Sequence, residues 1–335
     1  MLLPTLFAAF IAGASVIPGA TVDSAVDDRQ MFQKLEAATS ALAEKGNGPL
    51  RREDRLDQCK RTQTDAVRLS SKSLSGTPLE GADIFRRGAQ ASVLIGSAYK
   101  CDKCPKWHNT LASGFAITAD GVIATNHHVA AGATGEAMGV LTSDGRFFPV
   151  VEVLAANKAH DVALLRIEAK DLAFLPLRDD APAGSPIRCY SHPANTFGCI
   201  SEGIITRYFK MNETDRKGAV FMQITADYAR GSSGGPIIDA YGNAVGMVAS
   251  TSPVFTATPS PHAAAKDAKP VTPSQQMVRH NCATARALLD LIRPEVDARA
   301  PRDPPQRLIR WLLRKVVPSR PLFGGLLFLG RTLRP

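Results

Sequence analysis

The sequence predicts an all-β protein. From about residue 84 to residue 250 the chain is a series of short apolar or alternating runs, among them "ASVLIGSAYK", "DVALLRIEA" and "EGIITRYFK". The tetrads "ADGV", "SDGR" and "YGNA" separate some of these runs. Each places Gly next to Asp or Asn, which is typical of tight hairpins. Many short strands at this spacing indicate a barrel or a sandwich. The pattern lacks the regular helices that a parallel α/β sheet needs between its strands.

The first 22 residues, "MLLPTLFAAFIAGASVIPGATV", carry no charged side chain. An apolar run followed by small residues is typical of a secretory signal, here with cleavage after Ala14 or Ala20. An uncharged stretch of this length can also anchor a chain in a membrane. We therefore assign residues 1–20 to a signal peptide or an anchor, and expect an exported protein that is periplasmic, secreted or membrane-associated.

A polar segment, residues 21–80, precedes the strands. The stretch "DDRQMFQKLEAATSALAEKG" places Met31, Leu35, Ala38 and Leu42 on one face of a helix that would end near Gly46. The remainder, residues 47–80, is rich in Arg, Asp, Ser and Thr, so we expect a linker there.

The end of the chain changes character again. After a Pro- and Ala-rich loop that begins near residue 251, "QQMVRHNC" predicts a strand and "ATARALLDLI" a closing helix. Residues 301–335 carry seven Arg, one Lys and one Asp, which is +7 of the chain's +9. Because this excess is confined to a tail, we expect no nucleic-acid binding by the folded body.

The tail itself contains "QRLIRWLLRKVV", a basic amphipathic pattern with a tryptophan. Such a helix is typical of contact with a membrane surface, which residues 306–329 or the N-terminal segment would make. The alternatives are a helix docked on the protein's own body and a disordered end.

Six cysteines in an exported chain permit disulfides, and Cys189 and Cys199 flank one expected loop where a bridge is easy to form. The stretch "YKCDKCPKWH" places Cys101, Cys104 and His108 in a C-x-x-C-x3-H pattern that three zinc ligands could share. A fourth ligand, from His192 or another cysteine, is not evident. We therefore expect no metal and no cofactor, and a loop disulfide or free thiols instead.

Three stretches carry the residue types of nucleophilic catalysis. A serine nucleophile needs a base, an acid that orients the base, and donors for the oxyanion. "GVIATNHHVAAGA" contains His128, "AHDVALLRI" contains Asp161 and "ARGSSGGPIIDAYG" contains Ser233. The glycine-flanked serine also fits the nucleophile elbow of α/β-hydrolases, but that elbow needs a following helix, and its acid and histidine come later in the chain. Here Pro236 and an expected hairpin follow.

These stretches, with "SGFAITADGVIATNHHV" and "RCYSHPANTFGCISEGIIT", resemble trypsin-like serine proteases of the chymotrypsin fold, of the HtrA/Deg type. The resemblance covers roughly residues 82–292. It implies two antiparallel six-stranded β-barrels, forming a protease domain at residues 81–293, with added N-terminal and C-terminal helices. The remaining residues 294–335, a basic Pro-rich tail, are too few for the PDZ domain that such proteases often carry.

The resemblance also implies roles for individual residues. Ser233 would attack the scissile carbonyl, His128 would act as the base, and Asp161 would orient it. The backbone N–H groups of Gly231 and Ser233 would form the oxyanion hole. The neighbours His127 and Ser232 are the alternatives, and the family motif selects His128 by its place next to Val129 and Ser233 by the G-x-S-G-G frame.

The candidate substrate pocket consists of Asp227, Ala249 and Ser250. In trypsin-like enzymes an Asp six residues before the nucleophile lies at the base of the specificity pocket and selects Arg or Lys. HtrA-like proteins differ there, so we expect a buried, hydrogen-bonded Asp227 instead. The implied function is a serine endopeptidase acting on protein or peptide substrates through an acyl-enzyme. The alternatives are an inactive protease-like binding module and a zinc-dependent binding protein built on Cys101, Cys104 and His108.

Overall fold

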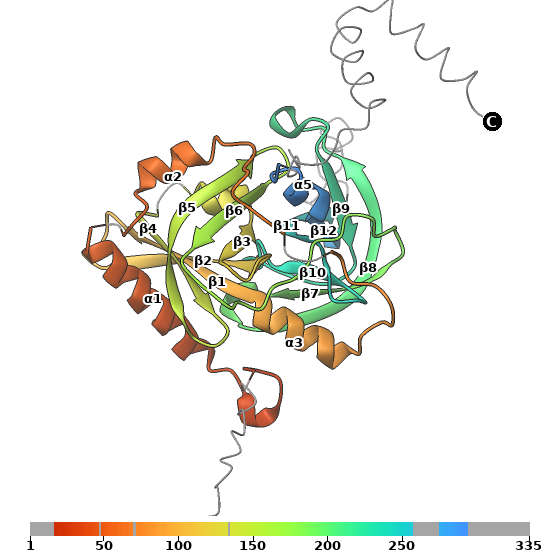
Figure 1. The fold of residues 1–335 in the computed structure, drawn as a ribbon, viewed down its shortest axis with the longest axis horizontal. Coiled ribbons are helices and arrows are strands. Elements are labelled where there is room, and N and C mark those ends of the chain that lie inside the picture. Colours follow the sequence, from red (N-terminus) through yellow and green to blue (C-terminus); the bar gives the residue numbers. More distant parts are fainter. Residues whose placement is uncertain (1–16, 47, 70–71, 133–134, 257–274, 294–335) are drawn as a thin grey trace, which may run out of the picture. The chain divides into compact units, whose positions relative to one another are not determined.

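Two closed antiparallel barrels of six strands each form the body of the protein (Figure 1). The computed structural model describes residues 17–46, 48–69, 72–132, 135–256 and 275–293. The strand order is β1-β2-β3-β6-β5-β4 in the first barrel and β10-β11-β12-β9-β8-β7 in the second. This confirms the predicted fold class of two six-stranded barrels.

The first barrel uses hairpins that the sequence predicts. Its strands are β1 (Ser92–Lys100), β2 (Trp107–Ala116), β3 (Val122–Thr125), β4 (Ala137–Thr142), β5 (Phe147–Asn157) and β6 (Val162–Ile167). The β2–β3 and β4–β5 connections pass through Gly121 and Gly145, both at positive φ. Glycine adopts that conformation without steric cost, which explains the "ADGV" and "SDGR" signals.

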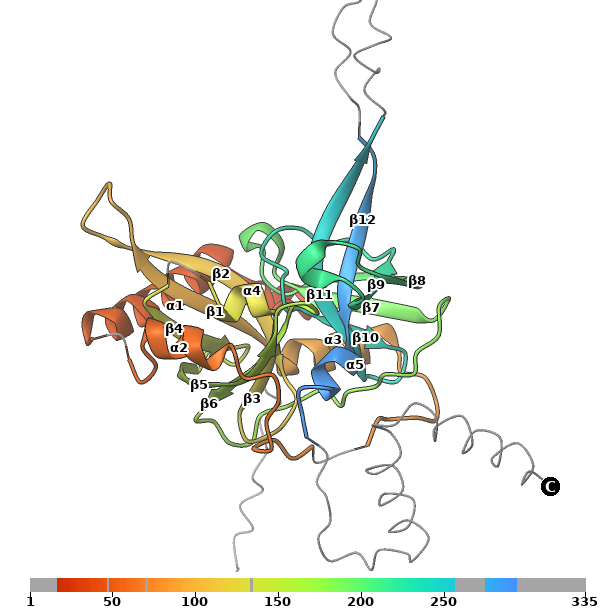
Figure 2. The same cartoon turned by 90° about the horizontal axis from the view of Figure 1, so that it is seen from above.

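The second barrel follows the same plan. Its strands are β7 (Pro186–Ser191), β8 (Cys199–Lys210), β9 (Val220–Ile224), β10 (Pro236–Asp239), β11 (Ala244–Phe255) and β12 (Gln275–Thr284). The predicted "YGNA" turn joins β10 to β11, and the predicted strand in "QQMVRHNC" is β12. In Figure 2 the paired β11 and β12 extend well beyond the barrel. The loop between them, residues 257–274, lies outside the described residues.

One hydrophobic cluster joins the two barrels. Phe115 and Leu164 of the first barrel belong to the same buried cluster as Phe221, Ile238 and Met247 of the second. Burying apolar area of this kind contributes roughly 25 cal/mol per Å², so the shared cluster fixes the barrels against each other. The loops that meet at their junction are thereby held in one arrangement.

Helices cover the outside of the barrels. The predicted N-terminal helix is α1 (Asp28–Glu44). Asp27 caps it by accepting a hydrogen bond from the Gln30 N–H, and its fully buried residues are Leu35 and Thr39. The predicted closing helix is α5 (Ala285–Leu289). The short helices are α4 (His127–Ala130), η1 (Val22–Ser24), η2 (Pro193–Asn195) and η3 (Thr214–Arg216).

Two of the longer helices were not expected. The stretch interpreted as a linker contains α2 (Arg52–Gln58), which packs against β5, and Thr64 pairs with Ile292. The helix α3 (Gly81–Ala91) leads directly into β1. The linker interpretation of residues 47–80 is therefore wrong for α2 and for the segment that pairs with Ile292.

None of the helices in the described part of the chain is long and apolar enough to cross a membrane. The chain divides into two compact units, Met1–Arg293 and Pro294–Pro335, and every described residue belongs to the first. The basic segment 306–329 and the first 16 residues lie outside the described residues, so membrane contact through either stays a prediction.

Candidate active site

The structure brings His128 and Asp161 together. His128 lies in α4, directly after β3, and Asp161 lies directly before β6, the strand that pairs with β3. The His128 Nδ1 atom is 2.9 Å from Asp161 Oδ2 and 3.1 Å from Oδ1. The backbone N–H of His128 also donates to Asp161 Oδ1, at 3.0 Å. The carboxylate is buried, whereas the imidazole is 47% exposed, so the ring can meet a molecule from solvent.

Local hydrogen bonds hold the Asp161 backbone in an uncommon conformation. Its φ is 55°, in the left-handed region that Asp and Asn tolerate better than other non-glycine residues. The side chain of Asn126 donates to the Asp161 carbonyl oxygen at 2.9 Å, and the Asp161 N–H donates to the carbonyl of Lys158 at 3.2 Å. These hydrogen bonds hold the carboxylate in a fixed position beside Nδ1 of the His128 ring.

The neighbouring histidine has a different environment. His127 is half-buried, and the desolvation by burial lowers its pKa. In the described part of the chain its ring makes no hydrogen bond to Asp161. The geometry thus favours His128 over His127 as the base.

The two serines of the glycine-rich loop also differ. Ser232 is fully buried, whereas Ser233 is partly exposed and lines a cavity of about 250 Å³ together with His128 and Gly231. No hydrogen bond joins the Ser233 hydroxyl to the His128 ring among the described residues. In unliganded sites this contact is often looser than a hydrogen bond. Ser233, not Ser232, is therefore placed where a nucleophile could meet substrate.

Two unpaired backbone donors lie beside Ser233. Within the described residues, the N–H groups of Gly231 and Ser233 donate to no other atom, although the N–H groups of Ser232, Gly234 and Gly235 all do. The Arg230 carbonyl accepts a hydrogen bond of 2.7 Å from the Ala194 N–H. Gly231 has a φ of 96°. These two free N–H groups are the candidate oxyanion donors.

Ser113 of β2 connects this loop to the first barrel. Its N–H donates to the Ser233 carbonyl at 2.8 Å, and its hydroxyl donates to the Gly231 carbonyl at 3.1 Å. The sequence interpretation missed this residue. The one sequence feature that could have indicated its role is its position at the start of the "SGFAITADGVIATNHHV" stretch. Ser113 fixes the candidate nucleophile loop against the barrel that carries His128.

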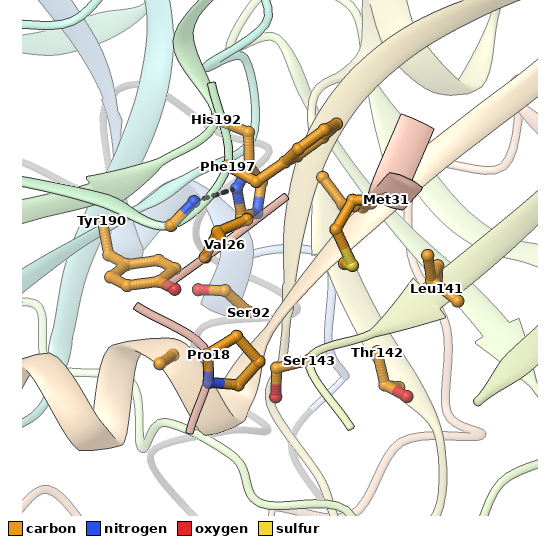
Figure 3. A pocket seen from close by; sticks show the side chains of 13 residues that line it. Pro18, Val26, Met31, Ser92, Leu141, Thr142, Ser143, Tyr190, His192 and Phe197 are labelled. Atoms are coloured by element: carbon orange, nitrogen blue, oxygen red, sulfur yellow. Dashed lines mark hydrogen bonds between the residues drawn. The ribbon is translucent and has the colours of Figure 1, made fainter. Parts of the chain in front are cut away.

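His192 is a buried residue of the loop that follows β7 (Figure 3). Its Nδ1 accepts a 3.0 Å hydrogen bond from the Gly198 N–H, and Pro18, Val26 and Phe197 line the pocket around it. The N–H of Phe197 in turn donates to Asp28 Oδ1 at 2.8 Å. The N-terminal segment thus supports the loop that touches the candidate oxyanion site.

The burial of His192 predicts a pH-dependent stability. Burial lowers the pKa of His192 to about 3, so the folded protein keeps this ring neutral at a pH where the unfolded chain protonates it. Stability from this group is complete above pH 6.5 and is lost as the pH falls toward 3. We expect a loss of about 2 kcal/mol in the free energy of unfolding between pH 8 and pH 5.

Urea unfolding at pH 8 and pH 5 measures this loss. The variant His192→Asn keeps an acceptor for the Gly198 N–H but does not titrate in this range, so its loss should be smaller than that of the wild type by about 2 kcal/mol. An equal loss in both proteins would contradict the assignment.

The residues expected to form the substrate pocket lie outside the cavity that Ser233 lines. The Asp227 side chain is 92% exposed and 3.8 Å from His280 Nε2, so the expectation of a buried Asp227 is wrong. The next residue, Tyr228, takes the buried position instead, with its hydroxyl 2.9 Å from the Ser250 carbonyl and 2.7 Å from that of Asn281. Asp227, Ala249 and Ser250 do not line the cavity that contains Ser233. Their part in substrate binding stays a prediction.

The six cysteines are free thiols, so the expected disulfides are absent. Cys189 pairs with Ser201 and Cys199 pairs with Ser191, so the two cysteines are offset along the β7–β8 hairpin. Cys101, Cys104 and His108 do converge at the end of another hairpin. His192 is not part of that group.

Comparisons with known proteins find similar sequences among serine endoproteases. Residues 112–247 match the family described as "Trypsin-like peptidase domain". A "Probable periplasmic serine endoprotease DegP-like" of Halomonas elongata is 33% identical over 151 residues, which cover 44% of this chain and 30% of that protein. "Serine endoprotease DegS" of Haemophilus influenzae is 30% identical over 142 residues, which cover 42% of this chain and 41% of that protein.

Among solved structures, "HtrA-type protease AlgW with tripeptide" has 23% sequence identity and a TM-score of 0.48, and the match covers 63% of this chain and 62% of that one. The chain spans less than half the length of each of these two curated relatives.

Proposed function

We propose that this chain, which contains a trypsin-like peptidase domain of the HtrA/Deg kind, is a serine endopeptidase that cuts protein or peptide substrates through an acyl-enzyme. The observation that carries the proposal is the His128–Asp161 pair on a cavity that Ser233 also lines. A buried carboxylate bound to a half-exposed imidazole is the arrangement that activates a serine hydroxyl.

Ser233, His128 and Asp161 would act in both halves of the reaction, the acylation of Ser233 and the release of the acyl group by water. The Ser233 Oγ attacks the scissile carbonyl while His128 takes its proton through Nε2, since Nδ1 faces Asp161. Asp161 holds the ring in this tautomer and stabilises the imidazolium. His128 then gives the proton to the leaving amine, and water releases the acyl group by the reverse sequence.

The tetrahedral intermediate would place its oxyanion near the N–H groups of Gly231 and Ser233. These donors are unpaired in the described structure, so they need not break a hydrogen bond to receive the oxyanion. A single donor of this kind typically contributes about 3–4 kcal/mol to transition-state stabilisation. Ser113 and the 192–198 loop, which contact this turn, would keep the donors in position.

An exported location belongs to the same proposal. The uncharged N-terminal stretch supports it, and so does the description of one relative as periplasmic. We infer that the substrates are proteins or peptides in the exported compartment.

A protease-like binding module is the second candidate function, because no hydrogen bond links Ser233 to His128 among the described residues. A fluorophosphonate probe separates the two functions, since it reacts only with an activated serine. We expect the wild type to be labelled at Ser233 and the variant Ser233→Ala to remain unlabelled, as read by mass spectrometry of the labelled peptide.

The matched control is Ser232→Ala, which removes the neighbouring hydroxyl. Because Ser232 is buried and does not line the cavity, this variant should still be labelled. A wild type that takes no label while remaining folded by circular dichroism would favour the binding module. Equal labelling of Ser233→Ala and the wild type would contradict the assignment of the nucleophile.

A further inference from the structure

The hairpin between β1 and β2 ends in a cluster of potential metal ligands. Cys101 and Cys104 lie in the connection, and His108 is the second residue of β2. The Sγ atoms are 3.5 Å apart, and the His108 Nε2 atom is 3.2 Å from the Cys101 sulfur and 3.0 Å from the Cys104 sulfur. Figure 2 shows this hairpin reaching out from the first barrel.

The triangle of donor atoms has nearly the size that a zinc ion needs. Tetrahedral zinc with Zn–S of about 2.3 Å and Zn–N of about 2.05 Å separates two sulfurs by about 3.8 Å and a sulfur from a nitrogen by about 3.6 Å. The observed separations of 3.5, 3.2 and 3.0 Å are shorter than these by about 0.3 to 0.6 Å. The sulfurs are too far apart for a disulfide, whose S–S bond is about 2.05 Å. A small outward movement of the three side chains would admit the ion.

Hydrogen bonding alone does not satisfy this arrangement. The His108 Nε2 either donates one hydrogen or accepts one, so it can form a well-directed hydrogen bond with only one of the two sulfurs that it approaches. Cysteine binds metal ions as the thiolate, so a bound ion would replace the thiol hydrogens of this cluster.

We propose that Cys101, Cys104 and His108 bind one Zn²⁺ ion, with a water molecule as the fourth ligand. Thiolate and imidazole ligands suit zinc, whereas calcium and magnesium take oxygen ligands. Among the described residues no other His, Cys, Asp or Glu joins the cluster. The three side chains are partly exposed, so water reaches the fourth position.

The ion would bind at the outer end of β2, a strand that also lines the cavity of the candidate active site. From His108, β2 continues to Thr110, Leu111 and Ala112, which line the cavity with His128 and Ser233. The next residue, Ser113, binds the carbonyls of Gly231 and Ser233. The zinc site therefore holds the outer end of the cavity wall and takes no part in the chemical steps.

Zinc content tests the site without reference to activity. The full chain, free of any affinity tag, is reduced, loaded with ZnSO₄ and dialysed, and its zinc is measured by elemental analysis. We expect one zinc per chain in the wild type and near none in the double variant Cys101→Ser, Cys104→Ser. X-ray absorption should show two sulfurs at about 2.3 Å and two lighter ligands at about 2.0–2.1 Å.

The matched control is Cys199→Ser, because Cys199 is also a partly exposed free thiol but lies outside the cluster. This variant should retain one zinc, and added Zn²⁺ should raise its Tm as it does for the wild type but not for the double variant. The proposal is overturned if the wild type stays free of zinc after loading, if the folded double variant binds as much zinc as the wild type, or if absorption shows no sulfur ligand.

Discussion

Replacing Asp161 with Asn is expected to lower kcat for peptide hydrolysis by about 10⁴-fold near neutral pH. The carboxylate accepts from His128 Nδ1 and from the His128 backbone N–H, so it fixes both the tautomer and the position of the ring. An amide presents an NH₂ group to the ring and can hold the wrong tautomer. It also lacks the charge that stabilises imidazolium.

Asn is the suitable substitution because it tolerates the backbone conformation of residue 161. Asp161 has a φ of 55°, and Asn tolerates this left-handed conformation, so the variant should keep its fold. Asp171→Asn is the matched control: Asp171 has a φ of 57° but is exposed and does not line the cavity that contains His128 and Ser233. Its kcat should be unchanged. Steady-state kinetics of the three proteins measure both effects, and similar values of kcat would show that Asp161 has no catalytic role.

The candidate triad could be predicted from sequence because each residue lies in a stretch with a recognisable pattern. The conformation of Asp161 could not, since its left-handed φ depends on hydrogen bonds with Asn126 and Lys158, which only the folded chain brings close. The buried position of His192 was missed for a similar reason. Pro18, Val26 and Met31, far away in the sequence, line the pocket that contains it.

The helix α2 shows a second kind of limit. Its sequence "REDRLDQ" has no apolar face, and the side chain that it buries is Arg55. Arg55 Nη2 donates to the carbonyls of Gly132 and Gly135, at 3.2 and 2.6 Å. Hydrophobic periodicity cannot detect a helix that is held by hydrogen bonds to a distant loop. The linker interpretation of this segment followed from its polar composition alone.

Replacing Gly231 with Ala is expected to lower kcat by about 10²–10³-fold, the effect of losing one oxyanion donor. Gly231 has a φ of 96°, and a Cβ there would lie 2.7 Å from the His192 carbonyl oxygen. That carbonyl belongs to a buried residue, so the 231 backbone must move instead and its N–H turns from the oxyanion. Because the oxyanion forms only in the transition state and the intermediate, KM should change little.

Gly218→Ala separates this effect from general backbone strain. Gly218 has a φ of 84°, comparable with that of Gly231, but a Cβ there would meet no atom within 4 Å. Both variants place Ala in a left-handed conformation, so both should lose stability in urea unfolding. Only Gly231→Ala should also lose kcat and react more slowly with the fluorophosphonate probe. If the two variants lost kcat equally, or if Gly231→Ala raised KM alone, the N–H of residue 231 would not be an oxyanion donor.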